Sequence, residues 1–265
     1  MLHLTSLDWF LAFAGAYLIG LSKTGIAGIG ILAVVIFALA FPGKQSPGIV
    51  LPILICADVI AVSSYWRHVV WPQLLRLFPW TAVGVVVGYE AMKFVNDHDV
   101  SRMIGFIAFG LTLLQIWRKA RIAKDPSRAD EVPHKVWFAL SMGILAGFAT
   151  MVANGAGPIM VLYLLATGLP KMEFMGTSAI FFFTVNCFKV PFQVALGQIS
   201  LHTLPMDALL APLAILGAVS GRLLLPHINQ KTFENIAIVL TIVAGLKLIF
   251  DDALVAQILR AVHPH

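Results

Sequence analysis

Two glycine-rich interruptions of otherwise apolar sequence carry the residues best suited to contact an anion. They read SKTGIAGIG at residues 22–30 and TMVANGAGP at residues 150–158. Glycines let the backbone turn tightly, and a helix that restarts after the turn directs free N–H groups and the positive end of its dipole at the break. At membrane depth these groups must face protein or a cavity, because lipid offers them no hydrogen-bond partner.

We expect the two breaks to meet near the middle of the membrane around one anion. The candidate binding residues are the polar and glycine positions of the breaks: Ser22, Lys23, Thr24, Gly25, Gly28, Gly30, Asn154, Gly155 and Gly157. Two plainer interpretations stay open. Both breaks also fit ordinary surface loops, and Lys23 also fits a lysine whose ammonium group reaches back to the membrane surface.

Three further polar residues lie inside apolar segments and are candidates for a solute path or for its coupling to protons. Asp58 sits in the middle of a long apolar segment, where a charged side chain is costly and therefore suggests a function. Asn186 occupies the matching place in the second half of the chain, and Lys189 follows it by one helical turn. Asp58 fits a proton carrier or a counter-ion for Lys23 or Lys189, and a purely structural buried pair stays open.

The composition identifies the class of protein to which these residues belong. Hydrophobic residues make up 59% of the 265 residues and charged residues only 12%, whereas an ordinary soluble domain carries roughly 25% charge. Such a chain cannot cover a water-exposed surface, so we predict an all-α integral membrane protein. The net charge of +5 fits cytoplasmic loops better than nucleic-acid binding, because no basic stripe alternates with aromatic residues.

Metal, disulfide and enzyme chemistry have little support in the sequence. The two cysteines, Cys56 and Cys187, lie in separate apolar segments, and no cysteine–histidine cluster has metal-ligand spacing. The chain lacks the Walker A motif of ATPases, the Gly-x-Ser-x-Gly motif and the His-Glu-x-x-His motif. We therefore expect no cofactor and no metal, and we keep an intramembrane enzyme only as a less favoured alternative.

Ten apolar segments must position the candidate residues. They cover residues 9–21, 28–41, 49–66, 74–94, 100–117, 137–151, 158–169, 174–196, 204–225 and 232–250. Six have roughly the 18–23 residues that cross a bilayer as a helix. The first two of each half are shorter, which predicts broken or re-entrant helix pairs.

A polar interval at residues 118–135 divides the chain almost in half. It carries six Lys and Arg residues against three acidic ones, which predicts a cytoplasmic loop and places both termini outside. We therefore divide the chain into a first transmembrane repeat (1–117), a basic cytoplasmic linker (118–135), a second transmembrane repeat (136–250) and a C-terminal tail (251–265). The tail has the pattern of an amphipathic helix on the membrane surface.

The two halves share a pattern of glycines and prolines. The Gly-x7-Gly-x-Gly pattern that begins at Gly20 recurs at Gly147 with an offset of 127, and Asp58 matches Asn186 at an offset of 128. The Pro-x4-Gly-x3-Gly pattern of residues 79–88 recurs at residues 212–221. Each half contains an odd number of segments, so we predict two inverted five-segment repeats, an arrangement found in many secondary transporters.

These features together resemble the TauE/SafE family of sulfite exporters over residues 8–250. The resemblance rests on the two breaks, the basic central interval, and the stretches at residues 58–68 and 186–199, which include the sequences YWRH and GQI. It implies a bacterial inner-membrane carrier of sulfur-containing anions such as sulfite, sulfoacetate, thiosulfate or related organosulfonates. Lys23 departs from the smaller or apolar residues that family members often have there, and its charge suits an anion.

We therefore expect a multi-pass protein of the bacterial inner membrane that exports small sulfur-containing anions by alternating access. The alternative is a transporter of another small anion, such as a carboxylate. The expected partners are the anion and membrane lipid, with a homo-oligomer left open.

Overall fold

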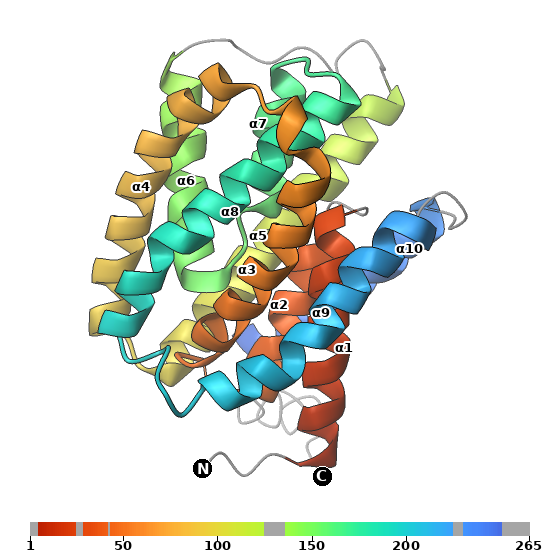
Figure 1. Ribbon diagram of the computed structural model, residues 1–265. Coiled ribbons are helices and arrows are strands. Elements are labelled where there is room, and N and C mark those ends of the chain that lie inside the picture. The colour runs from red at the N-terminus through yellow and green to blue at the C-terminus, as the bar shows by residue number, and fades with distance from the viewer. Residues whose placement is uncertain (1–4, 25–28, 42, 125–135, 225–229, 251–265) are drawn as a thin grey trace, which may run out of the picture.

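The computed structural model describes residues 5–24, 29–41, 43–124, 136–224 and 230–250. Within these ranges the chain is all helical, which confirms that part of the fold predicted from the sequence (Figure 1). The elements are α1 (Ser6–Thr24), α2 (Ile29–Ala40), α3 (Ser46–Tyr65), η1 (Trp66–His68), α4 (Trp71–Phe94), α5 (Asp97–Lys124), α6 (Val136–Ala153), α7 (Gly157–Ala166), α8 (Lys171–Ala195), α9 (Leu204–Leu224) and α10 (Gln230–Ile249).

Prolines mark the start of several helices. α3 and α4 each carry a proline in the first turn, where its missing N–H group leaves no hydrogen bond unmade. Pro158 is the second residue of α7, and α8 begins directly after Pro170. Interior prolines also occur at Pro52, Pro79, Pro191 and Pro212. Helices in membranes tolerate such residues, because neighbouring groups satisfy the freed carbonyls.

Among the described residues, four helical stretches are long and apolar enough to cross a membrane. They are Ser46–His68, Asp97–Trp117, Met172–Ala195 and Leu204–Leu223. Large apolar side chains such as Val87, Leu216 and Val243 are exposed on the outside of the bundle. A soluble protein rarely exposes so much apolar surface, whereas lipid solvates it. The structure is therefore that of a multi-pass membrane protein.

Small residues let helix backbones approach closely along two long helix pairs. α1 packs along α9, and α6 packs along α4. A Cβ atom at Gly20 of α1 would overlap the carbonyl oxygen of Ala214 in α9. In the same way, a Cβ atom at Gly147 of α6 would overlap the carbonyl oxygen of Thr81 in α4. Only glycine permits these contacts, as in other tightly packed membrane helices.

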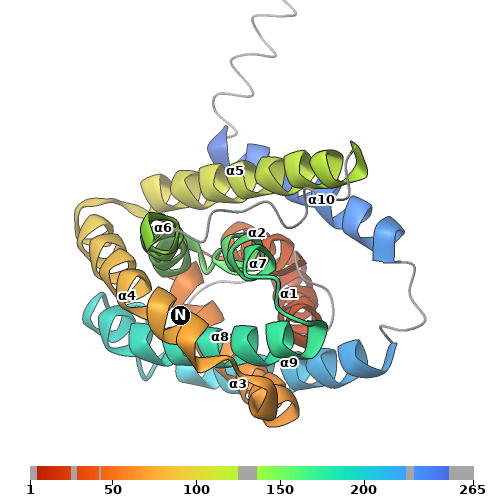
Figure 2. The same ribbon diagram turned by 90° about the horizontal axis from the view of Figure 1, so that it is seen from above.

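α2 and α7, the helices that follow the two breaks, lie inside the bundle (Figure 1). α5 finishes and α6 begins at one side of the bundle, which we call the linker end. The connection from α8 to α9 lies at the opposite side, which we call the α8–α9 end. α1 enters from the α8–α9 end and α2 returns toward it, while α6 enters from the linker end and α7 returns there. Seen from above, α2 and α7 lie near the centre, between α5 on one side and α8 on the other (Figure 2).

Several helices are longer than the apolar segments that predicted them. α1 has 19 residues and α6 has 18, so only α2 and α7, with 12 and 10 residues, are as short as expected. α5 also continues to Lys124, inside the interval assigned to the linker. Apolar composition underestimates α1 and α5 because their polar end residues are helical too. α6 is longer only by Val136, Val152 and Ala153. Residues 125–135 of the linker and the tail at 251–265 lie outside the described residues.

Candidate functional site

One cavity is bounded by both breaks. Its wall includes Ser22 and Lys23 from the end of α1 and Gly30 from the start of α2. Asn154 and Gly157, from either side of the second break, complete the opposing wall. About 100 Å³ of the cavity is open to the centres of water molecules. α3 and α8 close its sides. Segments more than a hundred residues apart in the sequence therefore share one space.

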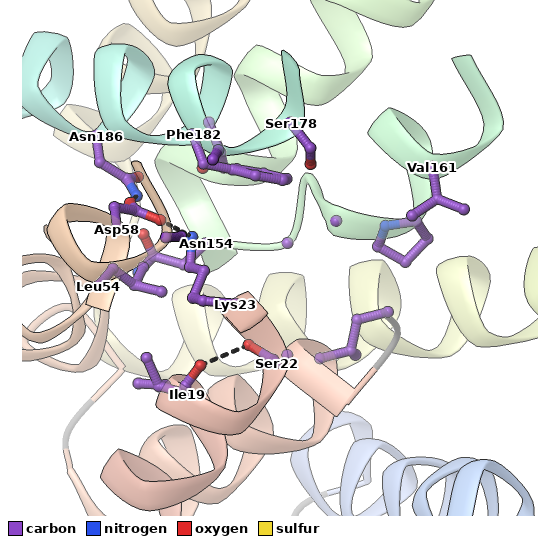
Figure 3. Close-up of a pocket in the computed structure, with 18 of the residues that line it drawn as sticks. Ile19, Ser22, Lys23, Leu54, Asp58, Asn154, Val161, Ser178, Phe182 and Asn186 are labelled. Atoms are coloured by element: carbon purple, nitrogen blue, oxygen red, sulfur yellow. Dashed lines mark hydrogen bonds and ion pairs between the residues drawn. The ribbon is translucent and has the colours of Figure 1, made fainter. Parts of the chain in front are cut away.

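An ion pair lies on the wall of this cavity (Figure 3). The Nζ atom of Lys23 is 2.7 Å from Oδ1 of Asp58, and the Nδ2 atom of Asn186 donates to Oδ2 of Asp58 over 2.6 Å. The side chain of Lys23 is 11% exposed and that of Asp58 is fully buried. Lys23 therefore points into the protein toward Asp58, instead of reaching back to the membrane surface.

An aromatic ring also contacts Lys23. Its Nζ atom lies 4.4 Å from the centre of the Phe182 ring, in α8. A desolvated ammonium group over an aromatic face gains roughly 2 kcal/mol. Asp58 and Phe182 together hold the ammonium group at the cavity wall, and no second acceptor contacts it among the residues that the structure describes.

Lys189 lies beside the cavity and contacts the end of α6. Its Nζ atom donates to the carbonyl oxygen of Thr150 (3.0 Å), to Oγ1 of Thr150 (3.0 Å) and to Oδ1 of Asn154 (2.6 Å). The side chain is fully buried. The three contacts match the three N–H groups of an ammonium ion, and the carbonyl end of a helix favours a positive charge. Lys23, and not Lys189, forms the ion pair with Asp58.

The second break is built around Asn154. This residue has a φ angle of 49°, in the left-handed region that asparagine tolerates better than most residues. The N–H of Gly155 then reaches back to the carbonyl oxygen of Ala149 over 3.1 Å, which satisfies one of the free carbonyls at the end of α6. The Nδ2 atom of Asn154 donates to the carbonyl oxygen of Pro47 over 3.1 Å. Both ends of its amide are therefore engaged with protein groups.

The start of α7 faces the cavity. Gly157 and Pro158 form its first residues and line the cavity wall. The first turn of any helix leaves N–H groups without partners inside the helix, and these groups carry partial positive charge. The break thus brings a helix N-terminus to the wall opposite Lys23.

The structure places the remaining predicted residues in different surroundings. Ser22 lines the cavity and its hydroxyl donates to the carbonyl oxygen of Ile19 over 2.7 Å. Thr24 faces α9 instead, where its hydroxyl donates to the carbonyl oxygen of Ala218 over 2.7 Å. Gly30 and Gly155 line the cavity, whereas Gly25 and Gly28 lie outside the described residues.

Three residues of this site are not among those predicted from the sequence. Phe182 and Ser178 line the cavity from α8, and Thr150 both lines it and accepts from Lys189. Ser178, Phe182 and Asn186 follow one another at four-residue intervals, the spacing of one helix face. That periodicity, extended back from Asn186, was the available signal.

Comparisons with known proteins identify the family. Residues 12–248 match the family described as Sulfite exporter TauE/SafE. The chain is also 26% identical, over 204 residues, to the Probable inner membrane transporter protein TsaS of Comamonas testosteroni. That alignment covers 76% of this chain and 81% of the relative. No solved structure matches the chain. The protein is a membrane transporter, not an enzyme, and it belongs to the TauE/SafE sulfite exporter family.

Proposed function

We propose that the protein exports small sulfur-containing anions, such as sulfite, thiosulfate or a small organosulfonate, across the bacterial inner membrane by alternating access. The observation that carries the proposal is the charge around the cavity. Two lysines lie at or beside its wall, Lys23, which is mostly buried, and Lys189, which is fully buried, and one carboxylate, Asp58, lies with them. With the lysines protonated the site has an excess positive charge, and a buried charge is stable only when it is paired.

The donors around the cavity suit an oxyanion. The ammonium group of Lys23 and the backbone at Gly157, in the first turn of α7, border the same space. Ser22 borders it too, but its hydroxyl donates to Ile19. Charge-assisted hydrogen bonds from such groups to oxyanions are short and strong. A water molecule occupies about 30 Å³ of liquid, so a space of about 100 Å³ for water centres accommodates a small anion. We assign Asn154, Asn186 and Lys189 to the support of this path, and Asp58 to the pairing of Lys23.

The packing of the glycines supports an inverted repeat. Gly20 meets Ala214 of α9, and Gly147 meets Thr81 of α4. Gly147 follows Gly20 by 127 residues, and Ala214 follows Thr81 by 133 residues. These are the offsets that relate the two halves of the sequence. Gly217 meets Tyr17, and Gly84 meets Ile144, again with offsets of 133 and 127.

The directions of the helices support the same proposal. α1 and α6 run in opposite directions, as do α3 and α8, and α4 and α9 (Figure 1). Asp58 and Asn186, which match each other in the two halves, form a hydrogen bond to each other. Both observations are expected for two repeats related by an axis in the membrane plane.

The distribution of charge supports the proposed orientation. Arg67 and Arg76 lie near the linker end, together with the end of α5, while Lys44 and Lys93 lie at the α8–α9 end. The linker end collects more basic residues, which supports a cytoplasmic position for it. A negative cell interior then drives an anion outward by about 2.3 kcal/mol per charge for each 100 mV, so efflux needs no coupling ion.

Flux from proteoliposomes under a fixed membrane potential tests the proposed substrate. Purified protein is compared with protein-free liposomes for efflux of sulfite, thiosulfate and sulfoacetate, and of acetate as a carboxylate. We expect the sulfur anions to leave faster than acetate. Faster efflux of acetate would support the alternative carboxylate carrier, and no protein-dependent efflux of any sulfur anion would contradict the proposal.

Lys23 is tested with the charge balance preserved. Lys23→Ala alone leaves Asp58 buried without its ion partner, which costs about 3–5 kcal/mol and threatens folding. The double variant Lys23→Ala/Asp58→Asn removes both charges, so we expect it to fold and to lose at least tenfold in sulfur-anion flux. Lys93→Ala, which breaks an exposed ion pair with Glu90, is the matched control and keeps its flux. A folded double variant with normal flux would reject Lys23 as a ligand.

A further inference from the structure

Two buried glutamines near the α8–α9 end have no hydrogen-bond partner for their side chains among the described residues. Gln193 in α8 is 0% exposed, and Gln198, in the connection to α9, is 3% exposed. Both the amide nitrogen and the amide oxygen of each side chain are unpaired. Buried amides almost always have partners, and unpaired ones indicate either water or a functional role.

Gln193 continues the polar face of α8 that supports the cavity. Asn186, Lys189 and Gln193 are separated by three and four residues, so they lie on one face of the helix. The first reaches Asp58 and the second reaches the end of α6. Four residues of helix rise by about 6 Å. Gln193 therefore lies about 6 Å along the helix axis from Lys189, toward the α8–α9 end.

Gln198 lies next to Gln193 and against the start of α3. Its backbone N–H donates to the carbonyl oxygen of Gln193 over 2.9 Å. A Cβ atom at Gly48 of α3 would overlap the backbone carbonyl of Gln198, so the two backbone segments are in contact there. The preceding residue, Pro47, accepts from Asn154 of the second break. The α6–α7 break, the start of α3 and the end of α8 are therefore joined in one contact region.

The cavity does not extend to these glutamines. On α8 it is lined from Phe174 to Asn186, beginning in the first turn at the linker end, and neither Gln193 nor Gln198 belongs to its wall. The contact between Gly48 and Gln198 lies at the α8–α9 end, beyond the part of α8 that lines the cavity. The structure thus shows a polar but closed region on one side of the site and a lined cavity on the other.

We infer that Gln193 and Gln198 line the second half of the anion's route, between the Lys23 site and the α8–α9 end, and that this half is closed in the present conformation. Separation of Gly48 from Gln198 would expose both amides to the passing anion. A neutral amide donates a hydrogen bond to an anion without the strong attraction of a lysine, and a solute must bind weakly enough to leave. The inference rests on the proposed anion transport.

Cysteine labelling tests the route without depending on flux. In a background where Cys56 and Cys187 are replaced by alanine, Gln193→Cys and Gln198→Cys are treated with an impermeant anionic methanethiosulfonate from the α8–α9 side. Leu201→Cys, at a position 84% exposed in the same connection, reports reagent access. Val194→Cys, at an adjacent position 51% exposed on the outer surface, reports a lipid-facing site.

We expect Leu201→Cys to react fast and Val194→Cys to remain unlabelled. Gln193→Cys and Gln198→Cys should react slowly, and sulfoacetate, which does not consume the reagent, should change their rates at least threefold. Absence of labelling at both glutamine positions under all conditions, with Leu201→Cys reactive, would overturn the inference. Labelling that does not respond to sulfoacetate but responds to acetate would retain the route and contradict the proposed substrate instead.

A second variant separates a transport role from a structural one. Gln193→Leu has nearly the same volume and removes an unpaired polar group, so we expect thermal stability to be unchanged or higher while flux falls at least fivefold. Val194→Leu is the control on the lipid-facing side and keeps its flux. Normal flux in a folded Gln193→Leu variant would overturn the role of this amide.

Discussion

The two buried lysines differ in what their ammonium groups contact. Lys189 donates to three acceptors at the end of α6, so its donors are fully used by the protein. The described contacts of Lys23 are one carboxylate and one aromatic ring, and its side chain borders the cavity. Because an anion needs free donors, Lys23 is the better candidate for a ligand and Lys189 for a residue that holds the second break.

Replacement of Lys189 tests this division at the level of single residues. Lys189→Met keeps the length of the side chain and removes the hydrogen bonds to Thr150 and Asn154. Hydrogen bonds to charged groups contribute about 1.5–3 kcal/mol each, so we expect lower thermal stability in detergent as well as reduced flux. Lys93→Met, on the exposed surface, should change neither. Unchanged stability of Lys189→Met would show that these contacts do not hold the break.

The helix pairs that enclose the site depend on close backbone contact. α1 and α6 each carry a break at one end and pack on a full-length helix, α9 or α4, along the rest of their length. Gly20 and Gly147 lie at the two contacts, where the neighbouring carbonyl oxygens leave no space for a Cβ atom. These long contacts fix the ends of α1 and α6, and therefore the positions of Lys23 and Asn154.

Alanine substitution at these glycines tests the helix contacts. We expect Gly20→Ala and Gly147→Ala to destabilise the protein by about 1–3 kcal/mol, the usual range for an overpacked core, because backbone atoms must move. Gly110→Ala, in α5, meets nothing within 4 Å and is the matched control. Thermal unfolding followed by size-exclusion chromatography measures the difference. Equal stability of all three variants would contradict the tight packing.

At the scale of the whole molecule, the arrangement of the two helix pairs is compatible with transport that needs no ATP hydrolysis by this chain. The helix pairs α1–α2 and α6–α7 enter from opposite ends and meet at one cavity. A conformational change that opens either end would give alternating access to the same site. The free energy for net movement of an anion then comes from the membrane potential and the concentration gradient.

The dependence of flux on membrane potential tests this mechanism. For a monovalent anion moved alone, 100 mV contributes about 2.3 kcal/mol, which equals roughly a fifty-fold difference in concentration at equilibrium. Proteoliposomes with a potassium gradient and valinomycin set the potential, and the final distribution of the anion is measured. A distribution that follows a pH gradient and ignores the potential would instead indicate proton coupling, for which Asp58 is the candidate.

The resemblance seen in the sequence identified the family, and the family match confirmed it. The apolar segments predicted the ten α-helices of the described residues but placed the ends of α1, α5 and α6 too early. In α1 and α5 the reason is that the helix continues through polar residues, which apolar composition does not include. The binding roles of the break residues stay predictions. Thr24 shows the difficulty, since it is adjacent to Lys23 in sequence yet faces α9, and helix geometry turns successive side chains by about 100°.

The sequence by itself determined a helical membrane protein, its family and the residues that interrupt its helices, because composition and glycine spacing are local properties. Only the tertiary structure decided that Lys23 pairs with Asp58, that Lys189 holds the end of α6, and that both breaks border one cavity. Those facts depend on how α1, α3, α6 and α8 pack. Contacts between residues more than a hundred positions apart leave no local pattern from which their geometry can be read.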